Sequence, residues 1–235
     1  MKTKFLILFL VIVAATGLAC NSQNQFGNNS ALNHNSHAGT NHNTATTATA
    51  ANVPMNHQDM NHGSAMNHSE MQSSPGAASA PYDLQFLDTM IAHHQGAVEM
   101  SKPVEAKAGR AELKTLAKNI IADQEKEIAQ MKKWREEWFA ALPPAINMEM
   151  AGMQDSMKGM DMKKLESLKG NEFDLEFINQ MTPHHGGAVI MAKEALRKSQ
   201  KEEIKTLANA IIKAQEAEIK QMKDWQASWS KEKSQ

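Results

Sequence analysis

Residues Met90–Met100 read MIAHHQGAVEM, and residues Met181–Met191 read MTPHHGGAVIM. The two stretches are 91 positions apart, since the first histidine of each pair is residue 93 or 184 and 184 − 93 = 91. The match extends in both directions. Tyr82–Phe139 aligns with Phe173–Ser230 without a gap, and 28 of the 58 aligned pairs are identical. The chain therefore contains an internal duplication, which predicts two copies of one structural unit.

Each copy has the hydrophobic pattern of two amphipathic helices. In the first copy, Leu84, Leu87 and Ile91 recur at helical spacing within a helix expected at about residues 82–107. A break is expected near Gly109, followed by a second helix at about residues 110–139. Four such helices of roughly 25–30 residues with short connections predict an all-α fold, an antiparallel four-helix bundle made of two tandem helical hairpins. The two hairpins should be related by an approximate two-fold axis.

Local signals refine these boundaries. Pro103 and Pro183 fall inside helical patterns, and each predicts a kink or a break. Ser199, with Glu202 three residues later, predicts a capping box at the start of the last helix. The expected parts are a first hairpin at residues 81–142, a connector at 143–171 and a second hairpin at 172–232.

The composition favours helices and excludes some classes of protein. Among 235 residues there are only 12 Gly and 7 Pro, but 17 Met and 10 His against a single Cys. The 25 basic and 26 acidic side chains give a net charge of −1, so charge does not suggest a nucleic-acid partner.

The first 19 residues have the features of a secretory signal peptide. Lys2 and Lys4 precede an apolar run that is too short to span a membrane stably. Gly17 and Ala19 fit the small-x-small rule of ordinary cleavage. Cys20 instead favours a bacterial lipoprotein acylated at that residue, although Gly17 stands where a lipobox prefers leucine. Either interpretation predicts an exported protein, in the periplasm or anchored to the outer membrane, with membrane contact only through a lipid at Cys20.

Residues 20–80 are expected to be a disordered tail, because they have too few apolar residues to offset the entropy of ordering. The tail contains three copies of Met-Asn-His. These copies predict metal ligands at Met55, His57, Met60, His62, Met66 and His68. A low-complexity tether is the alternative interpretation.

The connector contains six methionines within residues 148–162. We interpret them as thioether ligands, with core packing as the alternative. The six are Met148, Met150, Met153, Met157, Met160 and Met162. If the segment were helical, four of them, Met150, Met153, Met157 and Met160, would share one face.

The bundle itself carries the third group of candidate ligands. Histidines and methionines on the first helix of each hairpin are joined by polar residues and a methionine on the second. The set is Met90, His93, His94, Met100, Gln124, Glu127 and Met131, with Met181, His184, His185, Met191, Gln215, Glu218 and Met222 as repeat counterparts. Polar groups on a buried helix face are unfavourable unless they are paired or bind a metal. Hydrogen bonds between histidine and glutamate, without metal, are the alternative.

The donor types select the metal. Thioethers favour Cu(I), and imidazoles bind Cu(I) or Cu(II), so a copper ion is expected and silver should bind similarly, while another transition metal is the alternative. The Glu-x-x-His motif of di-iron bundles is absent from the repeats, which argues against oxygen-activating chemistry.

At these residues the chain resembles the domain of unknown function 305 family. The signature is Asp-x-x-Phe-x-x-x-Met-x-x-His-His-x-Gly-Ala-Val, followed by Leu-Ala-x-x-Ile-Ile-x-x-Gln-x-x-Glu-Ile-x-x-Met-x-x-Trp. It runs from Asp83 to Trp134 and again from Asp174 to Trp225. The resemblance implies a ferritin-like bundle and, as in some members, a periplasmic role in copper binding and copper tolerance.

These observations lead to one main hypothesis and two alternatives. The main hypothesis is a non-enzymatic, extracytoplasmic copper-binding protein that sequesters the ion or transfers it, with a copper transporter or metallochaperone as partner. The first alternative is a ferritin-like metalloenzyme with oxidase or peroxide chemistry at a His/Glu-ligated metal. The second is a metal-free structural or adaptor bundle.

Overall fold

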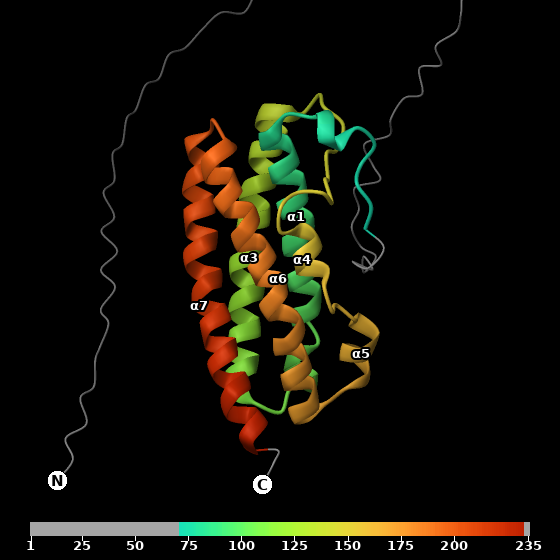
Figure 1. The fold of residues 1–235 in the computed structure, drawn as a ribbon, viewed down its shortest axis with the longest axis vertical. Coiled ribbons are helices and arrows are strands. Elements are labelled where there is room, and N and C mark those ends of the chain that lie inside the picture. The colour runs from blue at the N-terminus through green and yellow to red at the C-terminus, as the bar shows by residue number, and fades with distance from the viewer. Residues whose placement is uncertain (1–70, 233–235) are drawn as a thin grey trace, which may run out of the picture. The chain divides into compact units, whose positions relative to one another are not determined.

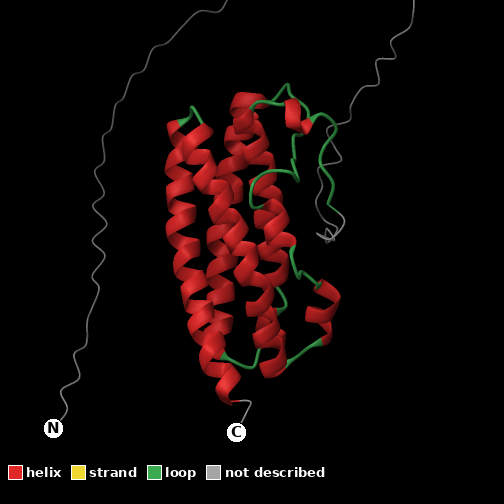
Figure 2. Ribbon diagram, viewed as in Figure 1, coloured by secondary structure: helices red, strands yellow, loops and turns green. Residues whose placement is uncertain are grey.

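The structure is a computed structural model that describes residues 71–232, all within the unit Met55–Gln235. Cys20, the predicted signal peptide and the Met-Asn-His motifs of the tail lie outside the described residues. Within residues 71–232 the secondary structure is helical, and the only β-type pairing is an isolated bridge between Ala108 and Gly170 (Figure 2). The all-α prediction is confirmed.

Four long helices form the body of the described region. They are α1 (Tyr82–Ser101), α3 (Ala111–Phe139), α6 (Gly170–Lys198) and α7 (Glu202–Glu232). The short elements are η3 (Ala77–Ser79), α2 (Val104–Lys107), α4 (Met153–Met157) and α5 (Met162–Ser167). Helix α1 packs against α3, α6 packs against α7, and α1 also contacts α6, which joins the two hairpins (Figure 1). The connector lies along this bundle, where α4 and α5 contact α6.

The two prolines behave differently. Helix α1 ends at Ser101, and Pro103 precedes the separate turn α2, so the predicted break is found there. Helix α6, by contrast, continues through Pro183 without interruption, and the predicted break at this residue is wrong. A proline removes only its own backbone hydrogen bond, and packing of α6 against α1, α4 and α7 holds the remaining backbone in place.

The predicted capping box at Ser199 is also wrong. Ser199 follows the last residue of α6, and its Oγ accepts a hydrogen bond of 3.0 Å from the backbone N–H of Lys201. Glu202 is already the first residue of α7, and its carboxylate accepts from Lys205. With Ser199 as the N-cap the first helical residue would be residue 200, so the helix begins two residues later than the motif requires, and Glu202 occupies the wrong position to close the box.

The apolar core of the described residues consists of two large clusters and a small third one, formed by Ala77, Leu84 and Ala145. The Met90 cluster includes Phe86, Leu87, Met90, Met131, Met191, Ile204 and Ile211. The Met100 cluster includes Met100, Leu113, Ile120, Phe177, Ile178, Met181 and Met222. These are repeat counterparts of one another, since each number in one cluster differs by 91 from a number in the other. Such an exchange between copies agrees with an approximate two-fold relation between the hairpins. Among residues 71–232, no helix is both long enough and apolar enough to cross a membrane.

Candidate metal centre

A layer of polar side chains separates the two apolar clusters at the middle of the bundle. Along α1, His93 and His94 lie between Ile91 of the Met90 cluster and Ala97 of the Met100 cluster, and Val98, a further residue of the Met90 cluster, lies just beyond them. On α6 the order is reversed, and His184 and His185 lie between Met181 of the Met100 cluster and Ala188 of the Met90 cluster. We call these four histidines, together with Gln124, Glu127, Gln215 and Glu218, the histidine layer. All four imidazoles are at most 1% exposed.

Two of the histidines meet at the interface between the hairpins. The ring centroids of His93 and His184 are 3.8 Å apart, and the ring planes are inclined by 33°. Each ring lies more than 6 Å from the neighbouring histidine on its own helix. Successive residues on a helix point in directions about 100° apart. His94 and His185 are therefore directed elsewhere than the central pair.

His94 and His185 each bind a carboxylate of their own hairpin. Nε2 of His94 lies 2.7 Å from Oε2 of Glu127, and Nε2 of His185 lies 2.8 Å from Oε2 of Glu218. The imidazoles are fully buried, whereas the glutamate side chains are 19% and 18% exposed. An ionised carboxylate only accepts hydrogen bonds, so the ring Nε2–H is the donor. These bonds connect α1 to α3 and α6 to α7.

Four acceptor atoms in the layer have no hydrogen-bond donor among residues 71–232. They are Nδ1 of His94, Nδ1 of His185, Oε1 of Gln124 and Oε1 of Gln215. The two glutamines are 4% and 3% exposed, so solvent does not compensate. Leaving a buried acceptor without a donor costs on the order of 1–3 kcal/mol. The same two atom types are left without a donor in both repeats, which indicates a feature of the duplicated unit.

The layer is only partly assembled as a metal site. No group of three or more His, Cys, Asp or Glu side chains within the described region has the arrangement to hold an ion. The predicted ligands His93 and His184 are brought together, whereas His94 and His185 are turned towards carboxylates. The imidazole nitrogens of the layer and the thioether sulfurs beside it are nevertheless ligands that suit a soft or borderline cation.

Methionine side chains border the layer on both sides. Met90, Met131 and Met191 belong to the Met90 cluster, and their counterparts Met181, Met222 and Met100 belong to the Met100 cluster. All six are fully buried. Oγ1 of Thr182 lies 4.0 Å from the sulfur of Met222. The thioethers are thus held inside the protein by three of the four long helices on each side.

The connector methionines occupy two kinds of environment. Met150 and Met153 are buried in the Met90 cluster, and Met148 packs against it. Met157, Met160 and Met162 are half-buried, and the last two pack against the Met100 cluster. Between Met148 and Asp161 only Met153–Met157 is helical, because Gly152 and Gly159 adopt positive φ angles of 89° and 76° on either side. Of the four methionines expected on one helix face, only Met153 and Met157 therefore share a helix.

A close contact between glycines places the connector against α6 just after the histidines. A Cβ atom added to Gly187 would lie 2.4 Å from the carbonyl oxygen of Gly152 and 2.5 Å from Cβ of Ser156. Only a residue without a side chain fits at this position. The sequence pattern pointed to His184 and His185 but did not identify Gly187 as the contact that brings the connector to the layer. The sequence feature that could have identified this contact is the glycine repeated in both signatures, which is Gly96 in the first and Gly187 in the second.

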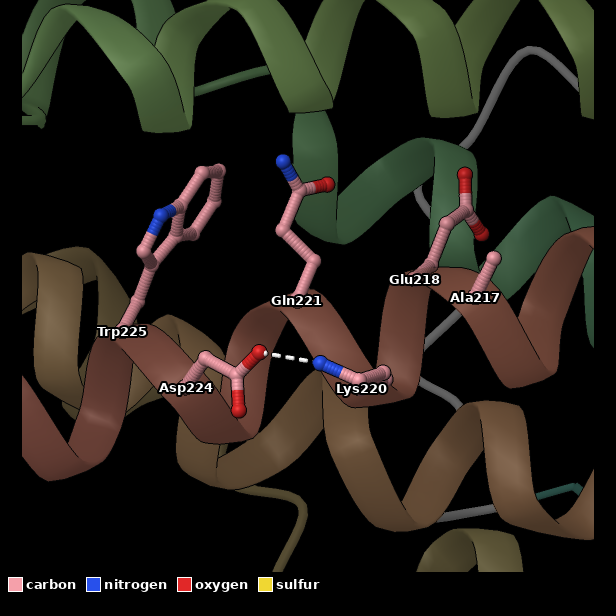
Figure 3. A pocket seen from close by; sticks show the side chains of 6 residues that line it. All are labelled: Ala217, Glu218, Lys220, Gln221, Asp224 and Trp225. Carbon is pink, nitrogen blue, oxygen red and sulfur yellow. Dashed lines mark hydrogen bonds and ion pairs between the residues drawn. The ribbon is translucent and has the colours of Figure 1, made fainter.

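A shallow depression on α7 leads from solvent to one carboxylate of the layer. It is lined by Ala217, Glu218, Lys220, Gln221, Asp224 and Trp225 and has a volume of about 310 Å³ (Figure 3). Lys220 Nζ and Asp224 Oδ2 form an ion pair of 2.7 Å at its edge. Because Glu218 lines this depression and also binds His185, the carboxylate stands between solvent and the buried imidazole.

Comparison with protein families decides the classification. The family model described as "Domain of unknown function (DUF305)" matches residues 22–135 and 83–226, which together span most of the chain. The chain belongs to the DUF305 family. The resemblance inferred from the repeated signature is confirmed. A comparison with curated protein sequences finds no match.

Solved structures of DUF305-type proteins resemble this chain. CopM in its Cu(II)-bound form is 42% identical, with a TM-score of 0.55, and the match covers 63% of this chain and 97% of CopM. CopM in its Cu(I)-bound form is 41% identical, with a TM-score of 0.54 and coverage of 63% and 96%. A DUF305 protein from Streptomyces coelicolor, described as a candidate secreted protein, is 34% identical, with a TM-score of 0.56 and coverage of 64% and 93%.

Proposed function

We propose that this chain binds copper ions, as Cu(I) or Cu(II), outside the cytoplasm, and that it sequesters them or transfers them and so contributes to copper tolerance. Silver is proposed to bind in the same way. The observation that carries the proposal is the histidine layer, where buried acceptors without donors lie between two methionine-containing clusters.

The donor chemistry supports copper over harder cations. Thioethers and imidazoles prefer soft and borderline metals, whereas Mg²⁺ and Ca²⁺ prefer sites built from several carboxylates and carbonyls. The only carboxylates in the histidine layer are those of Glu127 and Glu218, and each of them forms a hydrogen bond with a histidine. A cation bound inside the layer would satisfy acceptor atoms that the protein leaves without donors.

Similarity to CopM supports the same metals. CopM structures in Cu(I)-bound, Cu(II)-bound and Ag-bound forms are 41–42% identical to this chain. The match extends over nearly all of CopM.

Binding without turnover is part of the proposal. The alternative metalloenzyme would use the Glu-x-x-His motif of di-iron bundles, and the repeats lack this motif. The metal-free alternative would use the His94–Glu127 and His185–Glu218 bonds only to hold helices together. The metal-free alternative does not explain why Nδ1 of each ring is buried without a hydrogen-bond partner among residues 71–232.

The proposed location follows from the N-terminal sequence. A signal peptide at residues 1–19 would direct the chain out of the cytoplasm, and a lipid at Cys20 would anchor it at a membrane. A copper transporter or metallochaperone would then be the partner that supplies or receives the ion. The description of the S. coelicolor relative as a candidate secreted protein supports export.

A competitive titration tests the proposal. The mature chain is titrated with Cu(I) against a chelator of known affinity, beside the variant His93→Ala/His94→Ala/His184→Ala/His185→Ala. We expect the tightest binding to weaken by on the order of 100-fold or more, because ligands are removed. Helical circular dichroism checks that the variant folds.

The control for this titration is deletion of residues 22–80. That deletion should lower the number of bound ions and leave the tightest site unchanged. Binding that is micromolar or weaker, and equal in the wild type and the histidine variant, would rule out the layer as the site. Loss of the tightest site on deletion would place it in the tail.

A further inference from the structure

In each hairpin, the second histidine of the pair binds a glutamate through one ring nitrogen, and its other ring nitrogen has no hydrogen-bond partner among residues 71–232. Nε2 of His94 and Nε2 of His185 lie 2.7 Å and 2.8 Å from glutamate oxygens, and Nδ1 of each ring has no hydrogen-bond partner among residues 71–232. Both rings are fully buried. The arrangement is the same in the two hairpins, so it does not result from a local accident of packing.

The carboxylate fixes which nitrogen has the lone pair. Glu127 and Glu218 accept the hydrogen of Nε2–H, and a neutral imidazole carries only one N–H. In this tautomer Nδ1 of His94 and of His185 is an unprotonated acceptor, and both atoms are buried. An unprotonated imidazole nitrogen is the form that binds metal ions.

The neighbouring glutamines point to a cation as the missing partner. Oε1 of Gln124 and Oε1 of Gln215 are also buried in the layer and also lack a donor. A group of acceptors without donors is satisfied by a positive ion or by water molecules, which can donate. Water requires room and several polar partners, and the apolar clusters on either side of the layer provide few.

We infer that His94 and His185 bind the metal through Nδ1, and that Glu127 and Glu218 are positioning residues that hold each ring through Nε2–H. This assignment rests on the proposed function. The carboxylates lie across each ring from Nδ1 and are nearly one-fifth exposed, so they are directed away from the interior. A carboxylate behind a histidine ligand fixes the ring orientation and tautomer and increases the basicity of the coordinating nitrogen.

Nitrogen NMR of the full chain tests the assignment directly. The chain is labelled with ¹⁵N-histidine, titrated with Ag(I), and followed by long-range ¹H–¹⁵N correlation, with His94→Gln and His185→Gln variants to assign the signals. We expect the Nδ1 resonances of His94 and His185 to shift while their Nε2–H protons persist.

Three results would overturn the assignment. A shift of Nε2 with loss of its proton would place the metal on the other nitrogen. If the signals of both residues stayed unchanged while silver bound elsewhere in the chain, then water and not the metal would be the partner of Nδ1. Absence of any bound silver would contradict the proposed function itself, and the assignment with it.

A second experiment separates positioning from direct binding. Glu127→Gln/Glu218→Gln retains an oxygen that can accept from Nε2–H, whereas Glu127→Leu/Glu218→Leu removes it. We expect Cu(I) affinity within about threefold of the wild type for the glutamine variant, and 10- to 100-fold weaker affinity for the leucine variant. Equal, large losses in both variants would show that the carboxylates bind the metal. No loss in either would show that they have no role.

Discussion

At the scale of single residues, the histidine layer costs the protein stability in its metal-free form. Gln124 and Gln215 are buried amides whose Oε1 atoms have no donor within the described region. The residue types could be predicted, because helical periodicity placed histidine, glutamine and glutamate on the inner faces. The ring nitrogen that binds the glutamate could not be predicted, since it depends on the rotation of each ring towards Glu127 or Glu218.

Replacing one of these glutamines should therefore stabilise the metal-free chain. Gln215→Met removes the buried acceptor with similar volume, and we expect the free energy of unfolding to rise by about 1 kcal/mol. Urea denaturation measures this value. The stabilisation that the wild type gains from added Ag(I) should shrink in the variant. A less stable metal-free variant would indicate that Gln215 has a structural partner.

A second residue-scale prediction concerns Asp174, which is fully buried at the start of the second hairpin. Burial raises the pKa of its carboxyl above the ordinary value of 3.8, despite a hydrogen bond from Gly109 N–H and the charge of Arg110. Between 3.8 and the raised pKa, the folded chain holds a proton that the unfolded chain has lost. The contribution of Asp174 is therefore most favourable below pH 3.8 and is lost as the pH rises through the raised value.

Asp174→Asn removes this titration and keeps an oxygen for Gly109 N–H. We expect the stability of the variant, relative to the wild type, to increase between pH 3 and pH 7. Urea denaturation of both chains at each pH provides the comparison. A stability difference that stays constant with pH would contradict the raised pKa.

At the scale of helices, the long elements follow the hydrophobic pattern and the interruptions depend on tertiary packing. Helix α3 was expected at about residues 110–139 and is found at Ala111–Phe139. Periodicity identifies such helices because one face must be buried. The predicted break at Pro183 and the predicted start of α7 are wrong, because packing against neighbouring helices keeps α6 continuous and the turn after Ser199 is longer than a capping box. The contact of the connector with α6 involves residues far apart in sequence and has no periodic signal.

Two adjacent glycines in α6 provide a matched test of that contact. Gly187→Ala would place Cβ 2.4 Å from Gly152 O, so we expect a loss of about 1–3 kcal/mol in the free energy of unfolding. Gly186 has nothing within 4 Å of an added Cβ, so Gly186→Ala should stabilise the helix by about 0.5–1 kcal/mol. Urea denaturation followed by circular dichroism distinguishes the two. Similar effects of both substitutions would contradict the close packing of the connector on α6.

The two hairpins are also joined by symmetric contacts between a cation and an aromatic ring. The Arg110 guanidinium carbon lies 4.5 Å from the centre of the Trp229 ring, and Lys201 Nζ lies 4.3 Å from that of Trp138. Each cation directly precedes the second helix of one hairpin, and each ring belongs to the other hairpin. The two pairs are repeat counterparts, since 201 − 110 and 229 − 138 both equal 91.

Removing one such charge should weaken the association of the hairpins slightly. Lys201→Met keeps most of the aliphatic stem, and we expect a loss of about 0.5–1 kcal/mol in the free energy of unfolding, measured by urea denaturation. Lys223→Met, at an exposed position of α7, is the control and should change stability less. Equal effects of the two substitutions would show that the contact with Trp138 contributes nothing.

At the scale of the whole molecule, duplication explains why the candidate site lies at the centre. The two hairpins bring the same residues from opposite sides, so the central His93–His184 contact and both His–Glu bonds occur in one layer, and the exchanged methionines border it on both sides. The sequence repeat made this convergence predictable. The buried positions of Met150 and Met153 were not, because the path of the connector breaks the symmetry between the two ends of the bundle.

Anomalous X-ray diffraction from crystals of the copper-loaded chain, recorded on both sides of the copper absorption edge, tests the central claim most directly. The claim is that the histidine layer binds the ion. We expect anomalous peaks inside the layer, within coordination distance of Nδ1 of His94 and Nδ1 of His185, with Glu127 and Glu218 still bound to Nε2. Peaks confined to exposed methionines and histidines, with none in the layer, would contradict the claim.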